Sequence, residues 1–168
     1  MRLSTRGRYA VMAMVDLAAR QQEAGANSRG ERPVSLAELA QAQLLSLAYL
    51  EQLFGHLRRA GLVSSARGPG GGYRLARPAA ETTIAQIVDA VDEPIRATRC
   101  EEGSPGCLAG RRCLTHELWT ELGEQIRLFL GHVTLADVVE GRIIGRAMAP
   151  LGCGPAPEAA QVCRPLPG

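Results

Sequence analysis

Apolar residues recur at helical spacing near the start of the chain. Between residues 6 and 22 they fall three or four positions apart, as Ala10, Ala13, Met14, Leu17 and Ala18. This period places them on one face of an α-helix, and Ser4 or Thr5 stands where a helix cap is expected. The following residues 21–32, QQEAGANSRGER, have the composition of a loop. We therefore predict a first helix over Arg6–Gln22 that ends in a loop.

Two shorter helices are predicted next, each with its own start pattern. Ser35 and Glu38 form an S-x-x-E capping box, which satisfies backbone N–H groups at a helix start. Ser46 can cap the second helix, and Gly61 follows its end. One face of this second helix is apolar, and the other carries Tyr49, Glu51, Gln52, His56 and Arg59. A tight turn between two capped helices predicts a helix-turn-helix, with a small helical bundle as the alternative.

A basic β-hairpin is predicted directly after this helix pair. LVSSA alternates as a strand does, RGPGGG has turn composition, and YRLA can form the return strand. Gly68 and Gly70 begin a G-x-G pattern, but Tyr73 replaces the last Gly of a dinucleotide fingerprint, which excludes a phosphate-binding loop. Three arginines surround the predicted tip: Arg67, Arg74 and Arg77. Such a hairpin is typical of a winged-helix wing that contacts phosphates or a minor groove.

Three further helices and one loop are predicted in the second half of the chain. Thr83 and Gln86 cap a short helix, and Thr134 and Asp137 cap the last one. A longer helix starts between them, at Thr115, and its apolar residues are Leu118, Leu122, Ile126, Phe129 and Leu130. Because so small a domain has little core to cover a second apolar stripe, we predict that this helix pairs with its copy in a homodimer. The alternative is that it packs on its own chain.

The fold class that follows is mainly α with a small β-hairpin. A winged helix-turn-helix DNA-binding domain is expected over residues 1–80. A linker helix, a cysteine-rich loop and dimerisation helices are expected over residues 81–147. The remaining residues, 148–168, are Pro-rich and predicted to be a disordered tail, in which Cys153 and Cys163 are incidental thiols.

Charge divides the chain into a basic and an acidic half. Residues 1–80 contain eleven Arg and five acidic residues, a net charge of +6, whereas residues 81–168 contain eight Arg and twelve acidic residues, a net charge of −4. A basic front half favours contact with a polyanion. No apolar run approaches the eighteen or so residues of a membrane span, and Asp16 interrupts a stretch that imitates a signal peptide. We therefore expect a cytoplasmic protein that binds no membrane and has reduced cysteines.

The loop over residues 100–116 collects four possible soft ligands: Cys100, Cys107, Cys113 and His116. Their spacing is C-x6-C-x5-C-x2-H. Structural zinc sites usually use closer pairs, and ferredoxin spacings do not match either. A catalytic Cys–His pair needs a third orienting group, for which the sequence offers no candidate, so no enzyme is expected. Spacing alone leaves zinc and an iron–sulfur cluster open.

The chain resembles the IscR family of iron–sulfur cluster regulators, which are winged-helix transcription factors. The matching stretches are MRLSTRGRYAVMAM, LAYLEQLFGHLR, GLVSSARGPGGGY, DEPIRATRC and CLTHELW, within residues 1–135. The resemblance implies a homodimer with one 2Fe–2S cluster per subunit, provided by the cluster-assembly machinery. The implied ligands are Cys100, Cys107, Cys113 and His116. It also implies a nucleoid-associated protein, mainly a repressor, whose cluster occupancy selects promoters, usually those of cluster-assembly genes.

The same resemblance implies contacts with double-stranded promoter DNA. It carries over Ser46, Tyr49, Glu51 and Gln52 on the recognition helix and Arg67 in the wing, to which the polar helix face and the hairpin add Arg59 and Arg74. In the family the matching Glu helps to tell two classes of site apart by penalising the wrong one. Ala48 is a departure, because the family commonly has Ser there. One polar DNA contact is therefore missing.

Two other functions are weighed against this one. A sister group senses nitric oxide with similar cysteines but takes its fourth ligand from an N-terminal acid. The matching region here reads RGRYA, without an acid, while His116 is present, which favours the cluster regulators. The other alternative is an iron–sulfur carrier without a DNA role, against which the Arg-rich wing argues.

One extra residue also lies between Cys100 and Cys107 compared with the family pattern.

Overall fold

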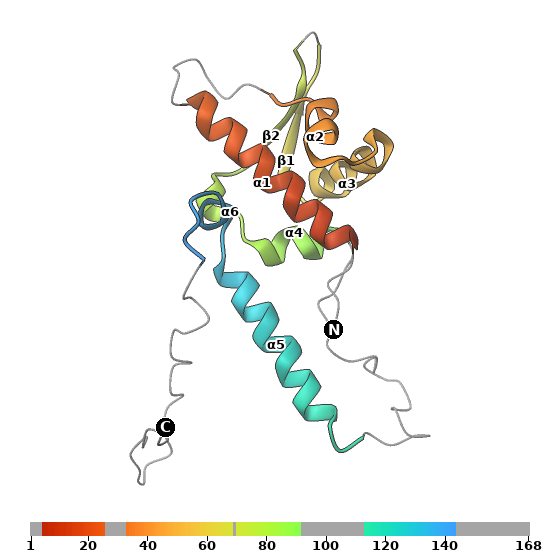
Figure 1. Cartoon of the computed structure of the whole chain (residues 1–168), viewed down its shortest axis with the longest axis vertical. Coiled ribbons are helices and arrows are strands. Elements are labelled where there is room, and N and C mark those ends of the chain that lie inside the picture. The colour runs from red at the N-terminus through yellow and green to blue at the C-terminus, as the bar shows by residue number, and fades with distance from the viewer. Residues whose placement is uncertain (1–4, 26–32, 69, 92–112, 144–168) are drawn as a thin grey trace.

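The chain is built mainly of helices and has a small two-stranded sheet. A computed structural model describes residues 5–25, 33–68, 70–91 and 113–143 (Figure 1). Its elements are, in order, α1 (Thr5–Gly25), α2 (Leu36–Gln43), α3 (Leu47–Arg59), β1 (Val63–Ala66), β2 (Gly72–Leu75), the 3₁₀ helix η1 (Ala79–Glu81), α4 (Ile84–Ala90), α5 (His116–His132) and α6 (Leu135–Val139). The predicted class, mainly α with a β-hairpin, is confirmed.

Several predictions fall outside the described residues. Cys100 and Cys107 belong to the undescribed segment 92–112. The tail over 148–168, with Cys153 and Cys163, is also undescribed. The three-part division of the chain, with boundaries after residues 80 and 147, stays a prediction.

Helix α1 forms the centre of the core. The predicted apolar face is buried, and Ala10, Ala13, Met14 and Leu17 have no exposed surface. This face packs against α2, α3, β2, α4 and α6, so elements from both halves of the chain meet on one helix. The helix continues to Gly25, three residues beyond the predicted end at Gln22.

The helix-turn-helix is formed by α2 and α3, and both predicted start patterns are confirmed. Ser35 Oγ accepts a hydrogen bond from Glu38 N at 3.2 Å, and Ser35 N donates to Glu38 Oε2 at 3.1 Å, which completes the capping box. At the start of α3, Ser46 Oγ accepts from Tyr49 N at 3.2 Å. Between the two helices, Leu44 ends α2 in the left-handed region with φ of 54°.

The wing is an antiparallel hairpin that is anchored to the helix-turn-helix at its base. In its register Val63 pairs with Leu75 and Ser65 with Tyr73. Tyr73 also exchanges two backbone hydrogen bonds of 2.9 and 2.8 Å with Val34, just before α2. The neighbouring Gly72 passes so close to the Val34 carbonyl that a Cβ atom would collide with it. Only glycine fits this close approach of two backbones.

The segments that lead into α4 and α6 pair with each other at the edge of the core. The predicted capping boxes at Thr83–Gln86 and Thr134–Asp137 are both present. The residues around the two caps also pair with each other, because Ile84 N donates to the Val133 carbonyl at 2.9 Å. Through this isolated bridge the chain returns from α5 to α4 and α1.

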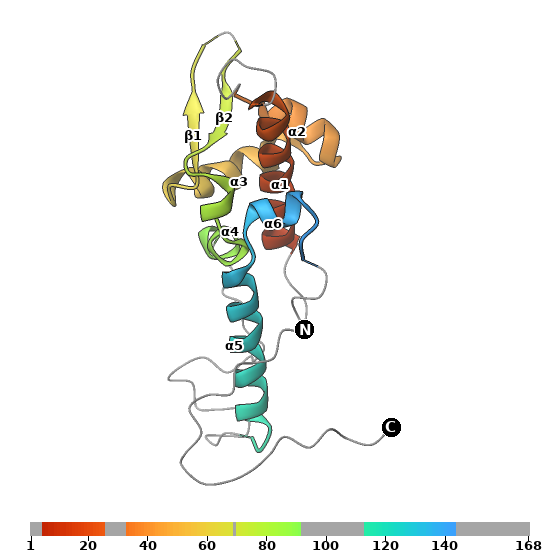
Figure 2. The same cartoon turned by 90° about the vertical axis from the view of Figure 1, so that its left-hand side faces the viewer.

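Helix α5 extends away from this core, as both views show (Figures 1 and 2). Its last turns approach α4, and its first turn lies at the end of the molecule opposite to the hairpin. Large apolar side chains on and just before α5 remain exposed: Leu114, Leu118, Trp119, Leu122, Leu128 and Phe129. Among the described residues, no helix is both long enough and apolar enough to cross a membrane.

Candidate nucleic-acid interface and metal ligands

Helix α3 presents the predicted recognition face. Leu50, Leu53 and Phe54 are buried against the core, which leaves the opposite face to the solvent. Glu51 and Gln52, both predicted DNA contacts, are exposed on that face. Their side chains are therefore available to base edges in a major groove.

The other predicted contacts of α3 are partly engaged within the chain. Ser46 is exposed, but its hydroxyl oxygen already accepts from Tyr49 N as the helix cap. Tyr49 is half-buried, and its ring meets the edge of the Tyr9 ring with centroids 6.1 Å apart. At the end of the helix, Arg59 is exposed and its Nε donates to the Gly55 carbonyl at 3.2 Å. These three residues therefore occupy defined positions before any DNA is bound.

The arginines of the hairpin divide into two kinds. Arg67 and Arg77 are exposed, one at the tip of the wing and one after its second strand. Arg74 lies within β2 and is half-buried, and its Nε is buried with no hydrogen-bond partner among the described residues. The wing therefore carries positive charge at its tip and also at its flank, as contact with a phosphate backbone requires.

Two polar residues of α1 make hydrogen bonds to other elements that the sequence did not predict. Asp16 on α1 accepts from Arg20 Nε at 2.8 Å and from Gln43 Nε2 of α2 at 3.2 Å. The hydrogen bond to Asp16 raises the pKa of Arg20 above its ordinary value. Gln21, also on α1, is 8% exposed and its Oε1 accepts from Leu75 N of β2 at 3.0 Å. Gln43 lies 27 residues from Asp16 along the chain and Leu75 lies 54 residues from Gln21, so spacing gave no sign of these two contacts.

Aromatic packing joins the wing to the recognition helix as well. The rings of Phe54 on α3 and Tyr73 on β2 meet edge to face, with centroids 4.9 Å apart. Since such contacts add to the apolar burial of both rings, the hairpin and α3 are fixed relative to each other. Contacts among α1, α3 and β2 therefore fix the hairpin relative to the recognition helix.

Two of the four predicted metal ligands are described, and they lie at the start of α5. Cys113 and His116 are both half-buried, and His116 N donates to the Cys113 carbonyl at 3.0 Å. Cys113 Sγ lies 3.5 Å from Thr115 Oγ1. Nδ1 of His116 is buried and has no hydrogen-bond partner among the described residues. A sulfur and an unsatisfied imidazole nitrogen one helical turn apart are suitable ligands for a soft metal centre.

The rest of the ligand set is untested. Within the described ranges, no group of three or more Cys, His, Asp or Glu residues is close enough to hold a metal ion. Cys100 and Cys107, which would complete such a group, lie outside those ranges. The structure therefore brings together one pair of the predicted ligands and leaves the other two as predictions.

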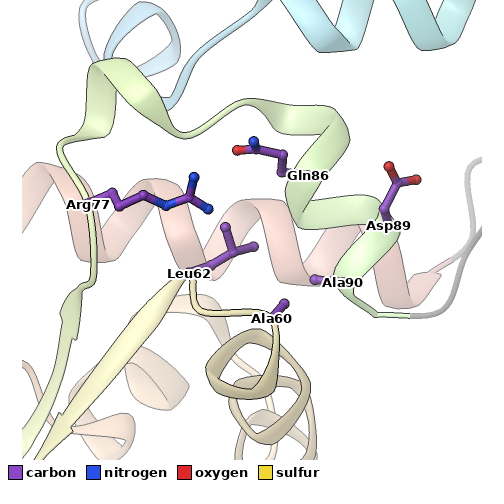
Figure 3. Close-up of a pocket in the computed structure, with 6 residues that line it drawn as sticks. All are labelled: Ala60, Leu62, Arg77, Gln86, Asp89 and Ala90. Atoms are coloured by element: carbon purple, nitrogen blue, oxygen red, sulfur yellow. The ribbon is translucent and has the colours of Figure 1, made fainter.

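A shallow cavity of about 390 Å³ lies between the end of α3 and α4 (Figure 3). Ala60, Leu62 and Ala90 supply apolar lining. Arg77 and Asp89 lie toward opposite sides of it, and Gln86 is the third polar residue of the lining. The lining contains neither Cys nor His, so this cavity is distinct from the predicted metal site.

Comparison with known proteins decides which family this arrangement belongs to. Residues 3–141 match the model of the Rrf2 family, described as iron-dependent transcriptional regulators. The chain belongs to the Rrf2 family. This Rrf2 family member is a DNA-binding transcriptional regulator and not an enzyme. The resemblance to the IscR regulators that the sequence showed is confirmed.

Similar curated proteins cover most of the chain. The HTH-type transcriptional regulator IscR of Xenorhabdus nematophila is 51% identical over 142 residues, which are 84% of this chain and 81% of that protein. IscR of Serratia proteamaculans is 50% identical over the same shares of the two chains. The likeness therefore extends through the helix-turn-helix and the cysteine-rich region.

Solved structures support the same fold. CymR, the global cysteine regulator of B. subtilis, matches with a TM-score of 0.66 and 34% identity, over 84% of this chain and 98% of its own. IscR of T. potens matches with a TM-score of 0.65 and 34% identity, over 84% of this chain and 88% of its own. A cysteine regulator and an IscR thus share this fold with the Rrf2 member described here, so the fold does not distinguish their signals.

Proposed function

We propose that this chain is a DNA-binding regulator, mainly a repressor, that senses iron–sulfur cluster status through one 2Fe–2S cluster per subunit and controls cluster-assembly genes. The proposed ligands are Cys100, Cys107, Cys113 and His116. The observation that carries the proposal is the pair at the start of α5. There the half-buried Cys113 and His116 are one turn apart, and the buried Nδ1 of His116 lacks a partner among the described residues.

Two comparisons support a role for iron. The matched family model is described as iron-dependent, and the similar curated proteins bear the name of IscR. The resemblance from the sequence connects that name with a 2Fe–2S cluster. The fit of Cys113 and His116 to soft-metal ligation agrees with this assignment.

The proposed ligand set has a chemical consequence. When bound, a 2Fe–2S cluster supplies a redox-active centre that is sensitive to oxidants and to the availability of iron. Replacement of one thiolate by the neutral imidazole of His116 makes the site less negative, which raises its reduction potential. A site with one such ligand suits a cluster that is easily lost, and therefore a sensor.

On the DNA side, we propose that α3 enters the major groove and the wing contacts the backbone. Glu51 and Gln52 are exposed on α3, and Arg67 is exposed at the tip of the wing. A carboxylate such as that of Glu51 accepts from cytosine N4 but repels phosphate and purine acceptors. Glu51 therefore penalises the wrong class of site, as the resemblance implies.

We propose that α5 forms the dimer interface. Leu118, Leu122 and Phe129 lie at helical spacing on one side of α5, and each is 37% or more exposed in the single chain. A self-complementary contact through this stripe would relate two recognition helices by a two-fold axis, as a palindromic operator requires.

Anaerobic purification followed by an absorption spectrum with iron and sulfide analysis tests the proposed cofactor. We expect visible absorption with about two iron and two sulfide per chain, as a 2Fe–2S cluster requires. A colourless protein that contains zinc and no sulfide would contradict the cluster. DNA binding by the same preparation is measured separately, so that the sensing proposal and the DNA-binding function are judged independently.

A further inference from the structure

The first turn of α3 presents apolar rather than polar side chains to the solvent. Leu47, its first residue, is 42% exposed, and Ala48 beside it is also exposed. One turn later the same two rows of the helix carry Glu51 and Gln52. The outer face of α3 therefore begins with an apolar pair and continues with a polar pair.

The Ser46 hydroxyl oxygen and the Tyr49 ring of this first turn already make contacts within the chain. The Ser46 hydroxyl caps the helix by accepting from Tyr49 N at 3.2 Å, and the Tyr49 ring packs against the Tyr9 ring. What remains outward on this turn is the side chain of Leu47 and the methyl group of Ala48. Neither side chain can accept or donate a hydrogen bond, so Leu47 and Ala48 can select a partner only by apolar contact.

Exposed positive charge lies at the start of α1, which adjoins this turn, and at the far end of α3. Arg6 and Arg8 in the first turn of α1 are exposed, and Arg8 adjoins Tyr9, whose ring touches Tyr49 of α3. Arg58 and Arg59 are exposed at the other end of α3. An apolar turn between guanidinium groups is suited to a polyanion with apolar groups in its groove, and less suited to an apolar protein surface.

The major groove of DNA offers one apolar group, the C5 methyl of thymine. The N-terminal residues of a recognition helix are those that meet base edges. We propose that Leu47, with Ala48 beside it, contacts the C5 methyl group of a thymine in each half-site. Leu47 lies one turn of α3 before Glu51, which contacts another base of the same half-site. This inference rests on the proposed docking of α3 in the major groove and adds a specificity determinant to it.

Removal of single thymine methyl groups tests the inference. A duplex is selected from a random library by the protein itself, and each thymine is then replaced in turn by deoxyuridine, which lacks the methyl group. Dissociation constants are measured for the wild type and for Leu47→Ala. For the wild type we expect one thymine per half-site at which the replacement weakens binding about fourfold, which corresponds to ~0.8 kcal/mol for one buried methyl group.

In Leu47→Ala that sensitivity should disappear, while the effects at other thymines remain. The matched control is Leu128→Ala on α5, since Leu128 is exposed to nearly the same degree, 45%. The control variant should keep the whole wild-type pattern. Because Leu47 lies on the surface, Leu47→Ala should retain the wild-type melting temperature and salt dependence, which shows that it is folded.

Two outcomes would overturn the inference, and they differ. If the wild type and Leu47→Ala respond alike to deoxyuridine at every thymine, Leu47 does not read a methyl group, although α3 can still dock in the groove. If the library yields no preferred sequence, the proposed base reading by α3 is itself wrong, and this inference fails with it.

Discussion

At the scale of single residues, the turn of the helix-turn-helix contains a leucine in an unfavourable backbone conformation. Leu44 has φ of 54° and a side chain that is 92% exposed. Its backbone N–H still donates to the Ala40 carbonyl, so the left-handed conformation closes the end of α2. A Cβ atom raises the energy of the left-handed backbone conformation, and glycine avoids this strain because it has no Cβ atom.

Leu44→Gly should therefore stabilise the fold. The strain that is removed exceeds the added entropy of glycine in the unfolded chain, so we expect the free energy of unfolding to rise by roughly 0.5–1 kcal/mol. Urea denaturation monitored by circular dichroism measures it. Leu44→Ala keeps a Cβ atom and serves as the control, for which no such gain is expected. An equal effect of both changes would show that backbone strain is not the cause.

The proposed ligands are also tested residue by residue. Cys107→Ala removes one of three thiolates, and we expect the visible chromophore of the anaerobically purified protein to be lost while the dimer stays folded. Cys163→Ala is the matched control, since this tail cysteine has no proposed role. A Cys107→Ala protein with its full chromophore would remove Cys107 from the ligand set.

At the scale of elements, α5 connects the proposed metal ligands at one of its ends with the DNA-binding core at the other. His116 is its first residue and Cys113 lies just before it, its middle carries an exposed apolar stripe, and its last turns pack near α4. Exposed large apolar groups that lie together on one face mark a surface for a partner. The second copy of the chain that we propose as this partner would cover the surface symmetrically, because each copy would bury the same side chains of the other.

Leu122→Glu should disrupt the proposed dimer. Leu122 is 37% exposed in the single chain, so a charge there costs little in the monomer but would be buried between two copies. We expect a monomeric mass by light scattering after size-exclusion chromatography. Leu128→Glu places the same charge on another side of α5 and should leave the mass unchanged. If Leu122→Glu keeps the mass of the wild type, the interface lies elsewhere.

At the scale of the whole molecule, the DNA face and the proposed cluster ligands lie at opposite ends. The hairpin and α3 form one end, and the first turn of α5 forms the other (Figure 1). Within one chain, a cluster held by Cys113 and His116 would therefore act on the DNA face through α5. Net charge follows the same division, with +6 in residues 1–80 and −4 in residues 81–168.

Binding to duplex DNA should depend steeply on salt, because phosphate contacts release counterions. We expect Arg67→Ala to weaken binding to all duplexes alike and to reduce the slope of log K against log salt concentration by about 1. Arg127→Ala is the control, since Arg127 on α5 is paired with Glu124 at 3.6 Å, away from the wing. Binding that is absent or independent of salt would favour the alternative of a cluster carrier without a DNA role.

Local patterns in the sequence were sufficient for the helices, the hairpin and most helix starts, although α1 ends three residues later than predicted and η1 was not predicted. The capping boxes at Ser35, Thr83 and Thr134, the cap at Ser46 and the hairpin all lie where predicted, because each depends on hydrogen bonds between residues close along the chain. The apolar period of α1 likewise predicted which residues are buried, since a helix can bury only one face in such a core.

Contacts between distant residues were decided by the tertiary structure. The pairing of Val34 with Tyr73, the hydrogen bond from Leu75 to Gln21 and the bridge between Thr83 and Thr134 have no local pattern, because they depend on how packed elements meet. The same holds for the position of the first turn of α5 at the end opposite to the wing (Figure 1). The sequence by itself supplied the residues that are proposed to bind DNA or a metal. Packing around α1 decided which of them lie on one face and how far apart the two sites are.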